Sequence, residues 1–459
     1  MSMTEEREVD VVVVGGGPAG EVLAGRLGER GLDVVMVEEH PVGGECSYYG
    51  CMPSKALLRP AQALAEARRV PGAAQAVTGA LDVRAVFARR DEVIHHQDDG
   101  AQLPWLEQRG VGLVRGHGRL AGERVVQVAD TSLRARRAVV VATGTAPFLP
   151  PVDGLREAQP WTNREATTAE EAPASLIVMG GGAVGVELAQ AYASFGSRVT
   201  LVELAPRILL HEEPFAAEQV RDGLRDAGVV VHEGVKITAV ARGGDGRITA
   251  RTEGAGTLEA DELLCASGRR QLTAELGLES VGLEPGGPIE VGDDLRVAGH
   301  DWLYVIGDAN GRALLTHMGK YQARVAADVI CGRDVAVRGA DAPPPRVTFT
   351  EPQVAAVGHT LESARDAGLN VRAVDVATDG TAGASFVGKG TGGTSRLVVD
   401  EDRRVVVGAT FVGAEVAEWL HAATIAVAAG VSVDELYHAV PAFPTRSEVW
   451  LKLIEAYGL

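Results

Sequence analysis

The sequence predicts an α/β fold with three domains: two Rossmann-like nucleotide-binding domains and a C-terminal α+β domain. Two observations lead to this prediction. A pattern of strand, glycine-rich turn, helix and strand occurs twice, with the turns beginning at Gly15 and Gly180. Hydrophobic residues make up 46% of the 459 residues and aromatic residues only 4%, while 57 residues are glycine. This composition is typical of an α/β protein rich in alanine, valine and glycine.

The first module begins with a run of valines at 11–14, which is typical of a buried parallel strand. A glycine-rich turn follows at 15–20, then a helix that extends to Gly31, and then a second strand at 34–38. This order of elements predicts one βαβ unit, in which the glycine turn joins the first strand to the helix.

The second module repeats the order, with a strand at 175–179, a turn at 180–185 and a strand at 199–203. Between the modules, residues 54–110 are predicted to be helical and residues 111–150 to form strands and turns. The remaining predicted elements are a strand ending at Asp308, a proline linker at 342–345, strands at 395–399 and 405–411, and helices at 414–429 and 446–457.

Each turn has the spacing G-x-G-x-x-G, with glycines at 15, 17 and 20 in the first and at 180, 182 and 185 in the second. This arrangement lets the backbone approach a pyrophosphate at the positive end of a helix. Each following strand ends in an acid, Glu38 or Glu203, which is predicted to accept hydrogen bonds from ribose hydroxyls. A solvated strand end is the alternative for either acid. Glu203 favours NADH over NADPH because its carboxylate repels a 2′-phosphate, whereas Arg207 nearby would partly offset this.

Cys46 and Cys51 lie five positions apart in a chain with four cysteines. In an ideal helix, Cα atoms at this spacing are roughly 8.6 Å apart, whereas a disulfide needs about 4.4–6.8 Å. A bridge would therefore bend the segment, and Gly50 is the residue that permits the bend. Two buried thiols or half of a metal site are the alternatives, but Cys265 and Cys331 are isolated and supply no second pair of ligands. We predict a redox-active disulfide.

Two dinucleotides and a disulfide predict an electron relay, in which a nicotinamide gives hydride, a flavin takes it, and the thiols pass the electrons on. Lys55 lies four residues beyond Cys51 and is predicted to place a cation near the flavin or the thiolate. A surface lysine is the alternative. Glu187, just after the second turn, either pairs with Lys55 or is an ordinary acid in the first turn of a helix.

Charge and composition exclude several classes of partner. The formal net charge of −18 argues against a nucleic-acid or anionic-membrane surface. The longest apolar runs are too short to span a membrane, and the first ten residues lack the apolar core of a signal peptide. Together with the few cysteines, these features predict a protein of the reducing cytoplasm.

Across its whole length the chain resembles the pyridine nucleotide–disulfide oxidoreductases of the glutathione reductase and lipoamide dehydrogenase type. The matching motifs occur in the family's order: residues 15–20, the Cys46–Cys51–Pro53–Lys55 block, Thr143-Gly144, residues 180–187, Gly268-Arg269-Arg270, Gly307-Asp308 and a C-terminal interface domain.

The resemblance implies FAD in the first module, NAD(P)H in the second, and a homodimer whose C-terminal domains meet. It implies that Cys51 is the flavin-facing thiol, that Cys46 is the interchange thiol that meets the substrate, and that Asp308 holds the FAD ribitol. The other residues it assigns to cofactor binding are Lys55, Gly118, Thr143, Gly144, Gly268 and His317. The domains it implies are an FAD domain at 1–150 and 270–340, an NAD(P) domain at 151–269 and an interface domain at 346–459.

Near the C-terminus, enzymes of this type carry His-Pro-Thr-x-x-Glu, and the His of the partner subunit is the acid/base for the interchange thiol. Here Pro444, Thr445 and Glu448 fix the register, and Phe443 occupies the position of the His. His438 is five residues early and is interpreted as a histidine at a helix end or on the surface. Phe443 and Glu448 are nevertheless the residues expected at this part of the catalytic site.

Two further departures concern the cysteines. Glu45 replaces the usual Thr before the first Cys, and its negative charge is expected to raise the pKa of Cys46. The chain ends without a cysteine pair, which argues against mercuric reductase and high-molecular-weight thioredoxin reductase.

The predicted function is that of an FAD-dependent NAD(P)H oxidoreductase that passes electrons from NADH through flavin to Cys46–Cys51 and on to a small acceptor. One alternative is a dihydrolipoamide dehydrogenase or a reductase of low-molecular-weight disulfides. Another is a quinone or electrophile reductase that uses the flavin directly. A non-enzymatic FAD-binding subunit is a third, disfavoured by the intact cysteine pair, Lys55 and Glu203.

Overall fold

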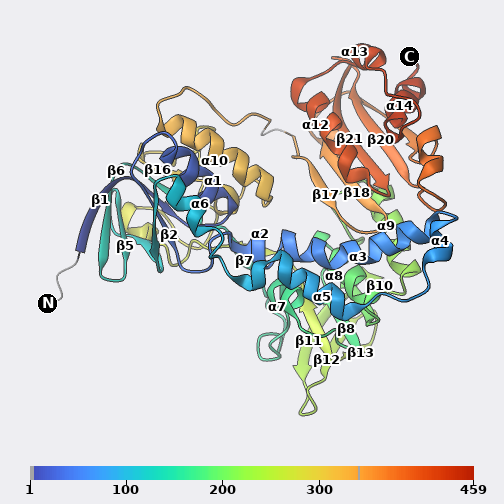
Figure 1. Ribbon diagram of the computed structural model, residues 1–459, viewed down its shortest axis with the longest axis horizontal. Coiled ribbons are helices and arrows are strands. Elements are labelled where there is room, and N and C mark those ends of the chain that lie inside the picture. Colours follow the sequence, from blue (N-terminus) through green and yellow to red (C-terminus); the bar gives the residue numbers. More distant parts are fainter. Residues whose placement is uncertain (1–4, 340–341) are drawn as a thin grey trace. The chain divides into compact units, whose positions relative to one another are not determined.

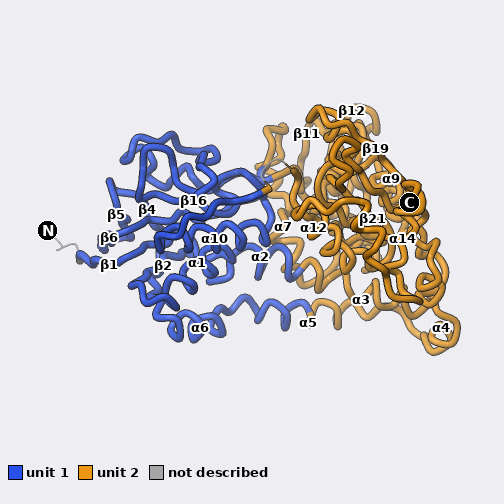
Figure 2. Tube along the Cα trace, turned by 90° about the horizontal axis from the view of Figure 1, so that it is seen from above, with its two compact units in different colours: residues 1–53, 90–148, 269–338 blue, residues 54–89, 149–268, 339–459 orange. Residues whose placement is uncertain are grey.

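The computed structural model describes residues 5–339 and 342–459 (Figure 1). The chain divides into two compact units, coloured differently in Figure 2. Two helices, α3 (Cys51–Arg69) and α5 (Val83–Val93), continue from one unit into the other. Unit 1 comprises residues 1–53, 90–148 and 269–338, and unit 2 comprises residues 54–89, 149–268 and 339–459. The three domain boundaries predicted from the sequence remain predictions.

A mixed sheet forms the centre of unit 1, with strand order β3-β2-β1-β6-β5-β4 and with β16 beside β6. Strands β1, β2, β3, β6 and β16 pair in parallel, and β4 and β5 extend the sheet as antiparallel strands. The bounds are β1 (Glu5–Val14), β2 (Val34–Glu38), β3 (Val111–Arg115), β4 (Gly118–Leu120), β5 (Val125–Val128), β6 (Thr131–Val141) and β16 (Leu303–Val305).

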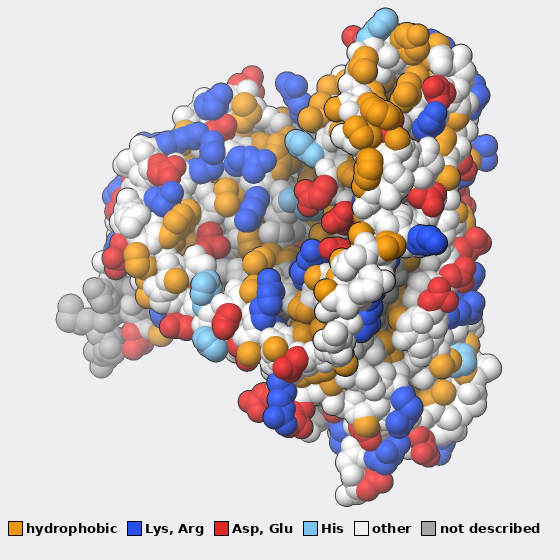
Figure 3. All heavy atoms as spheres, turned by 45° about the vertical axis from the view of Figure 1, so that its right-hand side comes forward, with side chains coloured by type: hydrophobic (Ala, Val, Ile, Leu, Met, Phe, Trp, Pro, Cys, Tyr) orange, Lys and Arg blue, Asp and Glu red, His pale blue; other side chains and the backbone are white. Residues whose placement is uncertain are grey.

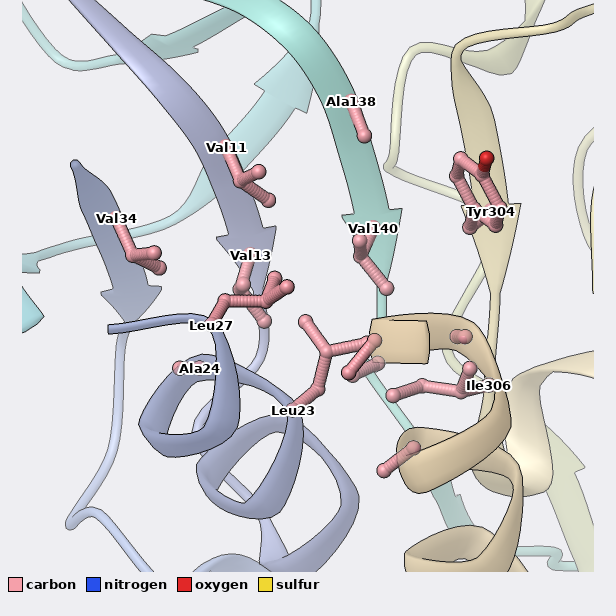
Figure 4. Packing of buried hydrophobic residues seen from close by; sticks show 14 of the residues in the cluster. Val11, Val13, Leu23, Ala24, Leu27, Val34, Ala138, Val140, Tyr304 and Ile306 are labelled. Carbon is pink, nitrogen blue, oxygen red and sulfur yellow. The ribbon is translucent and has the colours of Figure 1, made fainter. Parts of the chain in front are cut away.

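The valine run of β1 is apolar on both sides because both faces of the sheet are covered. Val11 and Val13 belong to one buried cluster, and Val12 and Val14 belong to another on the opposite face. Figure 4 shows Val11 and Val13 facing the helix that carries Leu23 and Leu27. The sheet therefore holds the end of β1, and the glycine turn after it, in a packed frame.

Helices α1 (Pro18–Gly28) and α10 (Thr316–Ile330) both pack on this face of the sheet, and alanines of α10 complete the cluster. Figure 1 shows α1 and α10 side by side over the sheet. The remaining elements of unit 1 are α2 (Gly44–Tyr48), η1 (His95–Gln97), α6 (Leu103–Gln108), β7 (Thr145–Pro147), β15 (Arg269–Gln271), η2 (Leu278–Val281) and η3 (Gly307–Asn310).

Unit 2 contains a parallel sheet of order β10-β9-β8-β14 and an antiparallel sheet of order β11-β12-β13. Their elements are α7 (Asn163–Thr168), β8 (Ser175–Met179), α8 (Ala183–Ser194), β9 (Arg198–Glu203), α9 (Pro214–Asp226), β10 (Val230–Glu233), β11 (Lys236–Arg242), β12 (Ile248–Glu253), β13 (Thr257–Ala260) and β14 (Glu262–Cys265). The short helix α4 (Ala73–Ala76) follows α3.

The C-terminal part of unit 2 is an antiparallel sheet of order β17-β18-β21-β20-β19 with helices packed against it. Its elements are β17 (Arg346–Thr348), β18 (Gln353–Gly358), α11 (Leu361–Asp366), β19 (Val371–Ala377), η4 (Ala382–Phe386), β20 (Thr394–Asp400), β21 (Val405–Gly413), η5 (Val416–Trp419), α12 (Leu420–Ala429), α13 (Val433–His438), η6 (Arg446–Glu448) and α14 (Val449–Tyr457).

Several predicted boundaries differ from the structure. Strand β1 begins at Glu5 rather than near residue 10, and α1 ends at Gly28 rather than Gly31. The predicted helix 414–429 begins only at Val416, because Glu415 has a left-handed backbone with φ 55°, and its first turn is the 3₁₀ helix η5. The predicted helix 446–457 likewise starts as the 3₁₀ helix η6. Within the described ranges, no helix combines the length and apolarity needed to cross a bilayer.

Candidate functional site

The first glycine turn brings three backbone segments too close together for side chains. A Cβ on Gly15 would lie 2.4 Å from the carbonyl oxygen of Ala142, and one on Gly20 would lie 2.0 Å from that of Gly15. Gly15 also has a φ of 110°, which disfavours any other residue. Gly17 differs, because its Cβ position faces open space at the start of α1. The turn therefore leaves room for a ligand where the helix presents its free N–H groups.

Polar groups around this turn fit a nucleotide. Glu38, at the end of β2, accepts hydrogen bonds from the backbone N–H groups of Gly16 and His40. Thr143, after β6, has a buried hydroxyl without a hydrogen-bond partner among the described residues. Buried polar atoms are rarely unpaired in a complete structure. The unpaired hydroxyl and the open space at Gly17 are thus consistent with the dinucleotide predicted for this module.

The second glycine turn has the same geometry in unit 2. A Cβ on Gly180 would lie 2.5 Å from the carbonyl oxygen of Ala266, one on Gly185 would lie 1.9 Å from that of Gly180, and one on Gly182 would meet no atom within 4 Å. The acid after the second strand repeats too, since Glu203 accepts from the N–H groups of Gly181 and Ala205. The two modules therefore share the geometry of the glycine turn and the hydrogen bond to the strand-end acid, as well as the sequence pattern.

Arg207 is hydrogen-bonded within its own loop. Its two terminal nitrogens donate to the carbonyl oxygens of Leu210 at 2.8 Å and Glu212 at 3.0 Å. The residue is thus engaged in holding its own loop.

The two neighbouring cysteines lie on different helices of unit 1. Cys46 belongs to α2, and Cys51 begins α3. The backbone bends between the helices, and a Cβ on Gly50 would lie 3.1 Å from the carbonyl oxygen of Glu45. The structure therefore contains the predicted bend, with Gly50 allowing a close approach of the backbone.

Cys46 and Cys51 are not joined by a disulfide here, and their sulfur atoms hydrogen-bond to each other. The hydrogen bond with Cys51, burial and the charge of Cys51 raise the pKa of the Cys46 thiol far above its ordinary value. The hydroxyl of Thr316, on α10, shares a hydrogen bond of 3.5 Å with the sulfur of Cys51, and its interaction with Cys46 lowers the pKa of that thiol. Of the two thiols, Cys46 therefore retains a proton, and a thiolate on Cys51 has hydrogen-bond donors beside it.

Glu45 acts differently from the expectation. The pKa of Cys46 is raised, but the leading causes are the hydrogen bond with Cys51 and burial. The Glu45 carboxylate pairs instead with Arg269 at 3.3 Å. Arg269 also donates to the hydroxyl and the carbonyl oxygen of Thr145. The negative charge of Glu45 is thus balanced by a guanidinium that the surrounding backbone holds in place.

Asp308, the acid expected to hold the FAD ribitol, belongs to the same network. It accepts a hydrogen bond from the hydroxyl of Thr145 at 2.7 Å. Burial raises the pKa of the Asp308 carboxyl, and the Arg269 guanidinium partly opposes this increase. The network places a half-buried carboxylate just after β16 and connects it through Thr145 and Arg269 to Glu45, the neighbour of Cys46.

Lys55 and Glu187 form an ion pair in unit 2, with 2.7 Å between the ammonium nitrogen and a carboxylate oxygen. The other carboxylate oxygen of Glu187 accepts from the N–H group of Phe349, whose ring lies 4.7 Å below the ammonium group. Glu187 is buried, so it is a specific partner rather than an ordinary helix acid. Since Lys55 lies on α3, four residues after Cys51, the pair fixes the Lys55 side chain one helical turn beyond this thiol.

The C-terminal segment lacks an acid/base group at the expected position. Phe443 is 77% exposed, and Glu448 accepts a hydrogen bond from the backbone N–H of Gly383 at 3.3 Å. His438 ends α13, where its ring packs edge-on against Tyr437. The interpretation of His438 as a helix-end histidine agrees with this placement.

Three other predicted cofactor residues occupy different settings. Gly118 lies in β4, where a Cβ would meet the side chains of Val14 and Val37, so its absence of a side chain serves sheet packing. Gly268 has a φ of 129° and faces open space, and His317 is exposed on the first turn of α10. Contact of these residues with a cofactor remains a prediction, as do the other assigned site roles.

The structure also shows polar residues that the sequence analysis missed. Thr316 and Lys320 carry no motif that marks them. Thr316 contacts the cysteines, and the charge of Lys320 acts on Cys46, because α10 packs beside α1. Glu21 follows the first glycine motif directly and is half-buried in the first turn of α1. The sequence offers one sign that Glu21 is unusual. It places a negative charge directly after a turn that is predicted to bind a phosphate, which a carboxylate would repel.

The stability of the protein freed of bound nucleotide is expected to depend on Glu21. Burial, with the charge of Glu38, raises the pKa of this carboxyl to about 7, although Lys320 lowers it. A raised folded-state pKa gives stability that is complete below the unfolded pKa and is lost as the pH rises through 7. Glu21→Gln should therefore be more stable than the wild type at pH 8 by about 3 kcal/mol, with little difference near pH 4. Denaturant unfolding at both pH values measures this, and a pH-independent difference would contradict it.

Comparison with known proteins agrees with this arrangement. The model of the pyridine nucleotide-disulphide oxidoreductase family matches residues 9–327, and the model of its dimerisation domain matches residues 344–454. The chain is 33% identical to a dihydrolipoyl dehydrogenase of Thermus scotoductus over 455 residues, covering 97% of each chain. It is 31% identical to a mercuric reductase of Streptomyces lividans, covering 97% of this chain and 95% of that protein.

Among solved structures, the HOCl-induced flavoprotein disulfide reductase RclA from Escherichia coli is similar, with a TM-score of 0.85 and 25% identity. The match covers 97% of this chain and 99% of RclA. The enzymes of this family use FAD and a pyridine nucleotide. The two glycine turns, the paired thiols and the full-length matches lead to one conclusion: the chain is an enzyme of the pyridine nucleotide-disulphide oxidoreductase family.

Proposed function

We propose that this enzyme transfers electrons from NADH to the Cys46–Cys51 pair and then to a small acceptor. The observation that carries the proposal is the pair of hydrogen-bonded thiols in unit 1, with a third hydrogen bond from Thr316. FAD, when bound, supplies the chemistry that converts hydride transfer into reduction of a disulfide. Gly15, Gly17, Gly20, Glu38, Thr143 and Asp308 are the residues that would hold it.

The two cysteines would act in sequence on a disulfide acceptor. The sulfur of Cys46 forms a bond to one acceptor sulfur as the acceptor disulfide breaks, which releases the first thiolate. The sulfur of Cys51 then displaces the second thiolate and restores the Cys46–Cys51 disulfide. Two electrons leave the enzyme, and the protons of its dithiol end on the two products. The role of Cys46 as the protonated thiol at rest is supported by its raised pKa.

The C-terminal segment favours acceptors other than ordinary aliphatic disulfides. A positioned acid/base group typically increases the rate of a proton-transfer step by about 10²–10⁴-fold. Phe443 has no group that can donate or accept a proton. Its exposed ring instead offers an apolar surface suited to a flat acceptor. A quinone, an aromatic disulfide or another flat electrophile is therefore the second candidate acceptor. Among the described residues, no group of three His, Cys, Asp or Glu side chains is placed to hold a metal ion.

A homodimer is proposed as the active form, because the C-terminal part matches the family's dimerisation domain. Several large apolar side chains of this part are exposed, and Figure 3 shows hydrophobic side chains gathered on the face at its upper right. The exposed apolar side chains of this part of the chain include Ile425, Tyr437, Val440 and Phe443. In this proposal Phe443 of each chain reaches the thiol pair of the other chain.

The acceptor class can be tested by anaerobic reduction with NADH followed by reoxidation. The reduced enzyme would be mixed with aliphatic disulfides, aromatic disulfides, quinones and metal ions, and the recovery of the oxidised flavin spectrum would be followed. Rapid reoxidation by aromatic disulfides or quinones, and slow reoxidation by lipoamide, supports the proposal. Absence of flavin bleaching by NADH would contradict the proposed electron path.

NADH is expected to give a kcat/KM at least about tenfold above that of NADPH, because a charged hydrogen bond to a ribose hydroxyl contributes about 1.5–3 kcal/mol. Glu203→Ala should remove most of this preference, since its carboxylate lies at the second turn and Arg207 is engaged elsewhere. Steady-state kinetics with both nucleotides measures the effect.

Glu38→Ala is the matched control, because Glu38 occupies the equivalent position in the first turn. It should weaken FAD retention and leave the NADH to NADPH ratio unchanged. Equal kcat/KM values for the two nucleotides in the wild type would refute the preference.

A further inference from the structure

Helix α10 presents two polar side chains to the thiol pair. Thr316, its first residue, shares a hydrogen bond of 3.5 Å with the sulfur of Cys51, and its interaction with Cys46 lowers the pKa of that thiol. Lys320 lies four residues later, and residues at this spacing share one face of a helix. Lys320 is exposed and forms no ion pair within the described part of the chain. The same face of α10 therefore carries a hydrogen-bond donor and an unpaired cation.

The charge of Lys320 acts on Cys46. Lys320 is the basic group that lowers the pKa of Cys46, against the larger effects of burial and Cys51. On α2, Glu45 is paired with Arg269, so neither charge is free. On α1, Glu21 interacts with Lys320, but burial keeps Glu21 largely protonated below pH 7. Lys320 is thus an exposed positive charge that acts on Cys46.

We propose that Lys320 selects acceptors that carry a negative charge and directs them to Cys46. This inference rests on the proposed function and narrows its acceptor class to flat, anionic molecules. Lys320 acts electrostatically: it attracts the acceptor and stabilises the thiolate that leaves when Cys46 attacks. Thr316 keeps the sulfurs in place. In an enzyme without a histidine at position 443, this cation reduces the cost of forming negative charge beside Cys46.

Chemical modification tests this proposal without turnover. The holoenzyme reduced by NADH would be treated with iodoacetate, which is anionic, or with iodoacetamide, which is neutral, and carboxymethylation or carbamidomethylation of Cys46 would be followed by mass spectrometry. Lys320→Met should lower the ratio of the iodoacetate rate to the iodoacetamide rate about fivefold, the equivalent of about 1 kcal/mol. Lys320→Arg should keep the ratio near the wild-type value.

Arg333→Met is the matched control, because it removes an equal charge just beyond the far end of α10, about 15 Å or more along the helix. Its ratio should equal that of the wild type. High salt should reduce the difference between the wild type and Lys320→Met. An unchanged ratio in Lys320→Met would overturn the proposal, and so would loss of FAD from this variant, since Lys320 would then be a cofactor ligand.

Turnover separates this inference from the proposed function. With dithiobis(nitrobenzoate), a dianionic aromatic disulfide, Lys320→Met should raise KM about fivefold, whereas with neutral dithiodipyridine KM should change less than about twofold. Equal effects on both substrates would overturn the proposal. If neither disulfide is reduced while the alkylation ratio still falls, the role of Lys320 stands and the proposed acceptor class fails.

Discussion

Replacement of Cys51 by serine is expected to lower the rate of acceptor reduction by NADH by at least about 10³-fold. The disulfide cannot form without this sulfur, and a serine hydroxyl does not ionise near neutral pH. The wild-type enzyme reduced by two electrons should show a long-wavelength absorption band from the Cys51 thiolate beside the flavin. This band should be absent from Cys51→Ser, although NADH should still bleach the flavin.

Cys46→Ser distinguishes the roles of the two thiols. It should retain the long-wavelength band, because Cys51 keeps its charge and its contact with Thr316, but it should reduce no disulfide. Cys331→Ser is the control, since Cys331 is a half-buried free thiol outside the cysteine block. Absorption spectra during anaerobic titration measure all three variants. An identical band in the wild type and Cys51→Ser would show that the roles are assigned wrongly.

The glycine turns were predictable because their requirements are local. A turn in which Gly15 touches Ala142 and Gly20 touches Gly15 admits no side chain, so the sequence must carry glycine there. The strands before the turns were equally clear, because a sheet covered on both faces needs an unbroken apolar run. The family resemblance followed from these features and from the cysteine block, and the family match confirms it.

The partners of the cysteines were not predictable from spacing. Arg269 and Thr316 lie more than two hundred positions from Glu45 and Cys51 in the sequence, and only the packing of β7, β15 and α10 brings them together in unit 1. The pKa of Cys46 is raised as expected, but its leading causes are Cys51 and burial rather than Glu45, whose carboxylate pairs with Arg269. The short strands β10–β13 were missed too, because their mixed polar composition resembles that of loops.

Phe443→His is expected to raise the turnover of lipoamide by about 10²–10⁴-fold over a slow wild-type rate. Disulfide interchange leaves a thiolate that must gain a proton, and phenylalanine cannot supply one, whereas imidazole titrates near neutral pH. Position 443 is exposed, so an imidazole fits without repacking the C-terminal sheet. To orient the new imidazole, the Glu448 carboxylate would need to give up its hydrogen bond from the N–H group of Gly383. This cost is the reason why the expected increase in turnover extends down to about 10²-fold.

The controls separate proton transfer from the loss of the aromatic ring. Phe443→Leu removes the ring without adding an acid/base group, so it should not speed lipoamide turnover and should weaken reduction of flat acceptors. Phe443→His combined with Glu448→Gln should lose part of the gain, because a carboxylate orients imidazole better than an amide does. His438→Ala should leave wild-type turnover unchanged, since His438 lies at the end of α13. Bleaching of the flavin by NADH should remain fast in every variant.

Wild-type turnover of lipoamide at about 10–10³ per second would show that another group already supplies the proton. The protein would then be an ordinary lipoamide dehydrogenase despite Phe443.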